Sequence, residues 1–317
     1  ANLRAGEILF QMKNFGTAQP YLEKALDLNA EHAPTCRYLG EIYLINQDHA
    51  KALAMAESCI ALGDKAPEVY LTRGKAHLAM GKYQECISDM EEVMSDPVNS
   101  PMANIIKAIA ATKLGEIERA KDLFSQSLIK FNESYQDLIL EARYEYALIL
   151  ANEGAVKDAL RQLYIIRNAG VSYKDTTHRI AIFSQVVNSR LISDILEDDA
   201  EAMIKNHLSK GLATVSHVIT KTVFPDPRSA YILTRKNASG QNIKQALGLD
   251  LNMRETPDNF LTNFLDFLDK QELSSGVLFS LFGFSEATVE ALDKAKYELT
   301  LYNLKDFESL LKGEKPL

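Results

Sequence analysis

Three cysteines and six histidines are the side chains in this chain of 317 residues that are suited to metal binding or redox chemistry. Cys36, Cys59 and Cys86 are odd in number, lie 23 and 27 residues apart, and form no C-x-x-C pair, which predicts reduced thiols and no metal site. The histidines are scattered, and the sequence has no G-x-S-x-G, H-E-x-x-H, G-x-G-x-x-G or Walker motif. We therefore predict no catalytic residues, no cofactor and no enzymatic activity.

Basic side chains gather in one segment of the chain. Between residues 205 and 254 eight Lys or Arg stand against two acids, Asp226 and Asp250, although the whole chain has a net charge of −8. Such a segment either contacts nucleic acid or an acidic partner, or forms an ordinary solvated face. No aromatic residues alternate with the basic ones in a stacking pattern. The residues predicted to contact an anion are Lys221, Arg228, Arg235 and Lys236.

The composition is that of a folded chain. Hydrophobic residues make up 46% and charged residues 25% of the sequence, with 15 Gly and 9 Pro. These values exclude collagen-like and disordered classes and allow one long or two ordinary domains. The most apolar stretch, residues 276–284, is too short to cross a bilayer. No export signal opens the chain at Ala1, so we expect a cytoplasmic protein, or a periplasmic one if an export segment precedes Ala1.

A repeat organises the first half of the chain. Gly6, Gly40 and Gly74 lie 34 residues apart, and Ala108 continues the column. Aligning the sequence on these residues brings a second set of small side chains into register, namely Ala18, Ala52, Cys86 and Ala120. The register slips around residues 135–139, after which a fifth copy follows. Periodicity of this kind predicts stacked structural units, each unable to bury its apolar face alone.

These columns resemble the tetratricopeptide repeat, a helix-turn-helix unit with small residues where its paired helices approach closely. Turn sequences such as Met80-Gly81-Lys82-Tyr83 agree with it, because Gly favours a helix end. The resemblance implies an α-solenoid of about five repeats over residues 1–175 that acts by binding protein. From Thr176 helical spacing continues without the repeat columns, which predicts a capping helix within residues 176–198.

The first helix of each pair is expected to line an inner groove. The predicted partner-binding residues are Tyr38, Leu44, Leu71, Leu78, Ile105, Ile109, Tyr144 and Leu148. Glu41 and Lys75 lie between them, and the same apolar side chains are equally suited to packing between repeats. An apolar groove favours an amphipathic helix or a hydrophobic segment. The family's carboxylate clamp, which grips acidic tails, is not expected, since Leu3, Glu7, Tyr38, Glu68 and Thr72 occupy its positions.

Residues 199–317 predict a small α/β domain with a mixed sheet. After a break at residues 197–199 and a helix over 200–211, segments rich in Val, Ile and Thr flank Pro225-Asp226-Pro227 and predict a hairpin of residues 214–224 and 229–234. The later elements are a helix from Thr256-Pro257, a buried strand over 276–282, a helix from Ser285 to Ala295, a strand over 298–302 and a last helix from Asn303. The late strand-helix-strand predicts a right-handed parallel crossover.

This order is similar to the restriction-endonuclease-like fold of the Mrr type, with Gly276-Val277-Leu278-Phe279 as the nearest local likeness. The resemblance implies an acid after the first hairpin strand and an acid-x-Lys triplet on the next, which together hold Mg²⁺ and support a water. Pro225-Asp226 and Thr234-Arg235-Lys236 imitate this layout. Because Thr234 stands in place of a carboxylate, we expect a degenerate, non-catalytic descendant.

The leading hypothesis is a non-enzymatic scaffold or assembly factor whose groove binds a largely apolar or amphipathic segment. The C-terminal domain is then a second interaction surface or an oligomer contact. One alternative is a DNA-binding or nuclease-related protein that acts through residues 205–254. Another is an envelope or periplasmic accessory of flagella or secretion.

Overall fold

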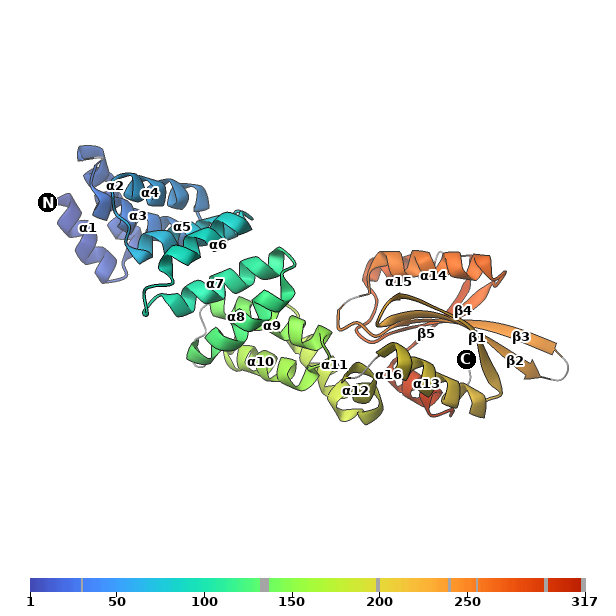
Figure 1. Ribbon diagram of the computed structural model, residues 1–317. Coiled ribbons are helices and arrows are strands. Elements are labelled where there is room, and N and C mark those ends of the chain that lie inside the picture. Colours follow the sequence, from blue (N-terminus) through green and yellow to red (C-terminus); the bar gives the residue numbers. More distant parts are fainter. Residues whose placement is uncertain are drawn as a thin grey trace. The chain divides into compact units, whose positions relative to one another are not determined.

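The computed structural model divides the chain into two compact units, Ala1–Tyr146 and Ala147–Leu317, which we describe in turn. The residues that the structure describes are 1–29, 31–131, 137–197, 200–238, 241–254, 256–293 and 296–314. The predicted slip around residues 135–139 therefore falls partly outside the described residues. Helices fill the first unit, and a mixed sheet with helices on both faces dominates the second (Figure 1).

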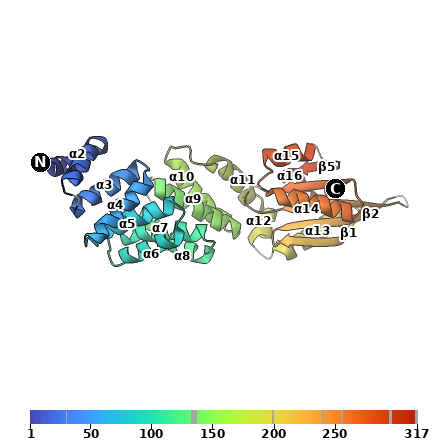
Figure 2. The ribbon, with the colours of Figure 1, turned by 90° about the horizontal axis from the view of Figure 1, so that it is seen from above.

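The first unit is a series of helices in which each packs on its neighbours in the chain. They are α1 (Asn2–Gln11), α2 (Phe15–Leu28), α3 (Ala33–Ile45), α4 (His49–Ala61), α5 (Pro67–Ala79), α6 (Tyr83–Val93), α7 (Ser100–Lys113), α8 (Ile117–Ser127), the 3₁₀ helix η1 (Leu128–Phe131) and the start of α9 (Asp137–Asn152). Figures 1 and 2 show consecutive helices running side by side as hairpins. Gly81 and Gly115 turn the chain between paired helices with φ of 74° and 79°.

Small side chains set the distance between paired helices, as the repeat columns predict. The side chains of the second column, Ala18, Ala52, Cys86 and Ala120, are all 0% exposed. At Gly74 a Cβ atom would come within 2.3 Å of Met90 Cε and 3.3 Å of Asp89 Cβ, so a larger residue there would displace the buried Met90 side chain between α5 and α6. The three cysteines are buried, free packing residues.

The second unit begins with the end of α9 and continues as α10 (Val156–Asn168), α11 (Thr176–Asn188), α12 (Arg190–Glu197) and α13 (Ala200–Thr214). The prediction of one capping helix beyond Thr176 is wrong, since α11 ends and α12 begins around Ser189, whose backbone is extended. Ser189 Oγ accepts from the backbone N–H of Ile192 at 3.4 Å and donates to Glu308. A cap of this kind restarts a helix without interrupting its apolar spacing. Residues 198–199 of the predicted break lie outside the described residues.

A five-stranded mixed sheet of order β1-β2-β3-β4-β5 forms the rest of the unit. Its strands are β1 (His217–Asp226), β2 (Ser229–Ala238), β3 (Gln241–Asp250), β4 (Ser275–Ser280) and β5 (Glu298–Tyr302), with the helices α14 (Asp258–Lys270), α15 (Glu286–Asp293) and α16 (Leu304–Leu311). The first three strands are antiparallel, whereas β3, β4 and β5 are mutually parallel. The predicted class, an α-solenoid followed by an α/β domain with a mixed sheet, is confirmed.

The sheet lies between two helical layers (Figures 1 and 2). On one face Phe264 and Leu268 of α14 pack with Leu278 of β4, and Leu292 of α15 joins the same core. On the other face the Phe279 ring of β4 stacks on Phe307 of α16 at 4.3 Å between centroids. Alternate residues of β4 thus serve opposite faces, which explains its unbroken apolar run.

The central strand β3 is absent from the prediction, which gave a two-stranded hairpin in its place. Its buried part, residues 246–250, shows no alternation because helices cover both faces of the sheet. Gly248 carries no strand signal, yet a Cβ atom there would lie 2.6 Å from Leu278 Cδ2 and 3.0 Å from Phe264 Cδ2. The glycine is needed for the close approach of α14 and β4.

Candidate functional site

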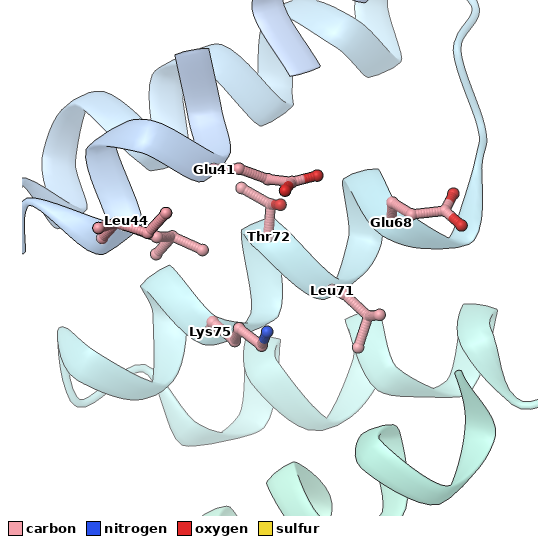
Figure 3. A pocket seen from close by; sticks show the side chains of 7 residues that line it. Glu41, Leu44, Glu68, Leu71, Thr72 and Lys75 are labelled. Carbon is pink, nitrogen blue, oxygen red and sulfur yellow. The ribbon is translucent and has the colours of Figure 1, made fainter. Parts of the chain in front are cut away.

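A hollow of about 450 Å³ opens between α3 and α5 in the first unit. It is lined by Glu41, Leu44, Ile45, Glu68, Leu71, Thr72 and Lys75. Figure 3 shows Glu41 and Leu44 of α3 facing this space together with the labelled side chains of α5. Its volume is within the range of about 300–1,000 Å³ found for small-ligand sites.

The repeat register explains why these side chains meet. Because α3 and α5 are the first helices of successive repeats and contact each other directly, Glu41 and Lys75 occupy the same position 34 residues apart. On α5, Glu68, Leu71 and Lys75 are spaced by three and four residues, which places them on one helix face. Three charged groups and three aliphatic side chains therefore face one space.

Glu41 and Lys75 are charged groups held partly away from water. Burial raises the pKa of the Glu41 carboxyl, with Lys75 opposing the rise and Glu68 adding to it. Burial also lowers the pKa of the Lys75 ammonium, against the attraction of Glu41. Neither side chain forms a hydrogen bond or an ion pair with any residue that the structure describes. Both charges therefore remain available to a ligand in the hollow.

Other charged side chains of the same helices are already paired. Arg37 on α3 donates from Nη2 to Asp64 Oδ2 at 2.5 Å. On α5, Arg73 donates from Nε to Asp89 Oδ1 at 2.8 Å, and His77 Nδ1 lies 2.9 Å from Asp89 Oδ2. These groups satisfy one another and belong to the architecture of the repeats.

The predicted groove residues divide into those that line the hollow and those that pack. Leu44 and Leu71 line it, and Leu71, which is 8% exposed, also belongs to an interior cluster. Tyr38 packs on the Phe10 ring at 4.9 Å between centroids, and Leu78 is a partly buried member of an interior cluster. Tyr144 is buried in the first unit and Leu148 half-buried in the second.

Ile105 and Ile109 correct the prediction most clearly, because they are 0% and 1% exposed and no ligand can reach them. An inward position in a repeat does not tell whether a side chain lines the groove or packs between helices, because apolar residues of the same type do both. Ile45, which is 52% exposed, was missed for the same reason. Glu41 and Lys75 were placed in the groove without a role. The sequence signal that could have identified Glu41 and Lys75 as site residues is that opposite charges occupy the same position in successive repeats.

Arg228, predicted to contact an anion, is bound by the protein itself. Its Nη1 donates to the Ala151 carbonyl and its Nη2 to the Leu196 carbonyl, both at 3.2 Å. Burial lowers the pKa of its guanidinium, with Asp226 and Glu153 opposing that change. Arg228 therefore joins the sheet to the helices of the second unit and is not a surface anion contact.

The other predicted cations lie on two faces of the sheet. Lys221 pairs with Leu233, and its Nζ lies 5.9 Å from the centre of the Phe267 ring of α14. Arg235 shares that face, because it is two residues beyond Leu233 on an unbulged strand, and Lys244 is its partner on β3. Lys236 points to the opposite face, where its charge adds to the burial that lowers the pKa of His217.

The nuclease-like layout predicted for Asp226 and Thr234-Arg235-Lys236 is wrong. Asp226 pairs with Ser229 at the start of β2, whereas Thr234 is buried farther along that strand and contacts His217. The strand that comes close to Asp226 is β3, which was not predicted from the sequence. It ends at Asp250, and Asn252 follows two residues later.

This cluster does not fit a Mg²⁺ site. Asn252 Nδ2 donates to Asp250 Oδ1 at 2.7 Å, to Ser229 Oγ at 3.1 Å and to Asp226 Oδ1 at 3.4 Å. An N–H donor therefore lies between the two carboxylates, where a cation would need oxygen ligands. Asp250 is 0% exposed, and its Oδ2 has no hydrogen-bond partner among the described residues. Within the described ranges no three His, Cys, Asp or Glu side chains form a metal-binding group.

Comparison with known proteins supports the repeat assignment. Residues 1–32 and 67–95 match the family model described as Tetratricopeptide repeat, so the chain carries tetratricopeptide repeats. Over 127 residues it is 29% identical to BBSome complex member BBS4 of Bos taurus, covering 40% of this chain and 23% of that protein. The chain thus spans about a quarter of that relative's length.

Solved structures of other repeat proteins are similar to the chain at low identity. They include pilF of Pseudomonas aeruginosa, with a TM-score of 0.49, 16% identity and coverage of 65% of this chain and 89% of the other. PilW, a type IV pilus biogenesis factor, has a TM-score of 0.47 and 15% identity, and the match covers 65% of this chain and 91% of PilW. YrrB, a repeat protein with an unusual peptide-binding site, has a TM-score of 0.41 and 18% identity, and the match covers 58% of this chain and 96% of YrrB. No helix in the described ranges is long and apolar enough to cross a membrane.

Proposed function

We propose that this chain is a non-enzymatic protein-interaction scaffold in which the hollow between α3 and α5 receives a segment of a partner protein. The observation that carries the proposal is the set of side chains in that hollow. Aliphatic residues line it together with Glu41 and Lys75, which form no hydrogen bond or ion pair with a described residue. Ligand sites combine apolar walls with a few polar groups that fix orientation. The similarity to a member of a multi-protein complex supports the same class.

The sheet of the second unit is proposed as a second interaction surface. Its two edge strands are β1 and β5, and they expose Val218, Val223 and Leu301, of which Val218 is 65% exposed. Edge strands with exposed apolar residues are available for pairing with another strand or packing against another protein. A second copy of the chain or another subunit would occupy them.

The restriction-endonuclease-like resemblance is proposed for the fold alone. The helix α13, the three-stranded meander β1-β2-β3 and the helix α14 before parallel β4 support it. Asp226 at the end of β1 then corresponds to the first acid, and Asp250 with Asn252 corresponds to the acid-x-Lys triplet, one strand later than the resemblance implies. With an amide donor in place of the lysine, we propose that no nuclease chemistry is retained.

Capture of a partner by the intact chain, followed by mass spectrometry, tests the scaffold proposal. The variant Leu44→Asp/Ile45→Asp places two carboxylates on the apolar wall and should abolish capture of the partner that the wild type retains. Val98→Asp is the matched control, since Val98 is 81% exposed and lies outside the hollow. Helical circular dichroism must stay unchanged, and Ile45→Asp alone serves if the double variant unfolds. Equal capture by all variants would contradict the proposal.

Nucleic-acid binding is a second candidate, favoured by the three cations on one sheet face. Lys221, Arg235 and Lys244 share the α14 side of β1, β2 and β3. For each phosphate that a DNA-binding protein contacts, the slope of the log of the binding constant against the log of the salt concentration becomes steeper by about 0.9. Arg235→Glu/Lys244→Glu should abolish a salt-sensitive anisotropy signal with duplex DNA, while Lys236→Glu on the opposite face retains most of it. A flat titration of the wild type at low salt eliminates this candidate.

A further inference from the structure

The ionisable groups of the hollow do not balance one another. Glu41 and Glu68 are two carboxylates, and Lys75 is the one cation among the lining residues. The charge of the nearby Arg37 is shared with Asp64 through the ion pair between them. The lining residues therefore include one more carboxyl group than cations, beside the aliphatic side chains Leu44, Ile45 and Leu71.

Both carboxyl groups line the same hollow, Glu41 from α3 and Glu68 from α5. Burial is the main cause of the raised pKa of Glu41, and the negative charge of Glu68 adds to it. Asn99 Nδ2 donates to Glu68 Oε1 at 3.3 Å and holds that side chain at the rim. The charges of Lys75 and Arg37 act on Glu41, but no described residue forms an ion pair with either carboxylate.

We infer that the hollow recognises a lysine or arginine side chain in the partner segment, held between Glu41 and Glu68 with an aliphatic neighbour packed on Leu44 and Ile45. A charge-assisted hydrogen bond to a partly buried carboxylate is about twice as strong as a neutral one. This inference rests on the proposed function. It adds the requirement that the segment bound in the apolar groove carries a positive charge.

Selection of random linear peptides displayed on phage against the full chain tests the inference. Recovered peptides should carry Lys or Arg at one position next to Leu, Ile, Val or Met. The tightest peptide is then synthesised together with a copy in which that basic residue is Glu, and the two are compared by calorimetry. The acidic copy should bind at least about tenfold more weakly.

Three variants of the chain sharpen the test. Glu41→Gln/Glu68→Gln should weaken the basic peptide about tenfold and tighten the acidic copy, since like-charge repulsion is removed. Lys75→Met should tighten the basic peptide, since it removes a competing cation from the hollow. Glu57→Gln, an exposed glutamate of α4, is the matched control and should change neither affinity.

The outcomes separate this inference from the proposed function. Peptides that depend on Leu44 and Ile45 but show no basic residue overturn the charge requirement and leave the scaffold proposal intact. A selection that yields no peptide, or a tighter fit of the acidic copy, also overturns the inference. The scaffold proposal is judged separately, by partner capture with Leu44→Asp/Ile45→Asp.

Discussion

Two groups of charged side chains in this protein differ in how far they satisfy themselves. In the hollow between α3 and α5, Glu41 and Lys75 form no hydrogen bond or ion pair with a described residue. At the strand ends of the second unit, the Asn252 amide donates to Asp226, Ser229 and Asp250. The first group is open to a ligand, whereas the second is joined by its own donor.

This difference separates binding groups from structural ones. A buried charge costs free energy unless it is paired, so groups that serve only the fold are found with partners. The Arg73, His77 and Asp89 network between α5 and α6 belongs to that kind. Glu41 of α3 and Lys75 of α5 do not belong to that kind, although Lys75 lies on the same helix as Arg73 and His77. Three substitutions test the distinction, beginning with the largest expected effect.

Asp89→Ala should lower the free energy of unfolding by about 3 kcal/mol, because it leaves the Arg73 guanidinium and the His77 ring without their acceptor in a buried site. Asp89 is 2% exposed. Urea unfolding at neutral pH measures the change. Glu92→Ala, at an exposed position of the same helix, is the control and should change stability by less than about 0.5 kcal/mol. A small loss in Asp89→Ala would remove the network from the structural class.

Asn252→Ala should cost about 2 kcal/mol, because two carboxylates lose a shared donor and one of them is fully buried. Urea unfolding followed by circular dichroism measures the change. Asn259→Ala on the exposed surface of α14 is the matched control. Unchanged stability would mean that the amide is not what holds Asp226 and Asp250 together.

Glu41→Gln should leave stability at neutral pH unchanged or raise it by less than about 1 kcal/mol. The pKa of Glu41 is raised in the folded chain, so ionising this group is harder there than in the unfolded chain. Wild-type stability should therefore fall as pH rises from the ordinary pKa of Glu to the raised one, and the variant should lack that fall. Thermal unfolding across this window checks the sign. A loss of stability in Glu41→Gln would show that Glu41 has a structural partner.

The helical repeats were predictable because their packing is local and recurs. Small residues at a period of 34 identify the paired helices of the first unit, and Gly81 and Gly115 mark the ends of α5 and α7. The later strands β4 and β5 and the capped helix α16 were also predicted, since apolar runs and an Asn303 cap are short-range signals. Short-range signals did not predict the break at Ser189, because the cap there separates α11 from α12 without changing the spacing of the apolar residues.

The sequence by itself determined the repeat, the order of most elements and the buried role of the cysteines, because each depends on residues close in the chain. Tertiary structure alone decided that β3 pairs between β2 and β4, and so brings Asp250 and Asn252 to Asp226. It also decided that Ile109 packs while Ile45 lines the hollow. Both outcomes depend on which elements cover a residue from elsewhere in the chain, and no local pattern encodes that coverage.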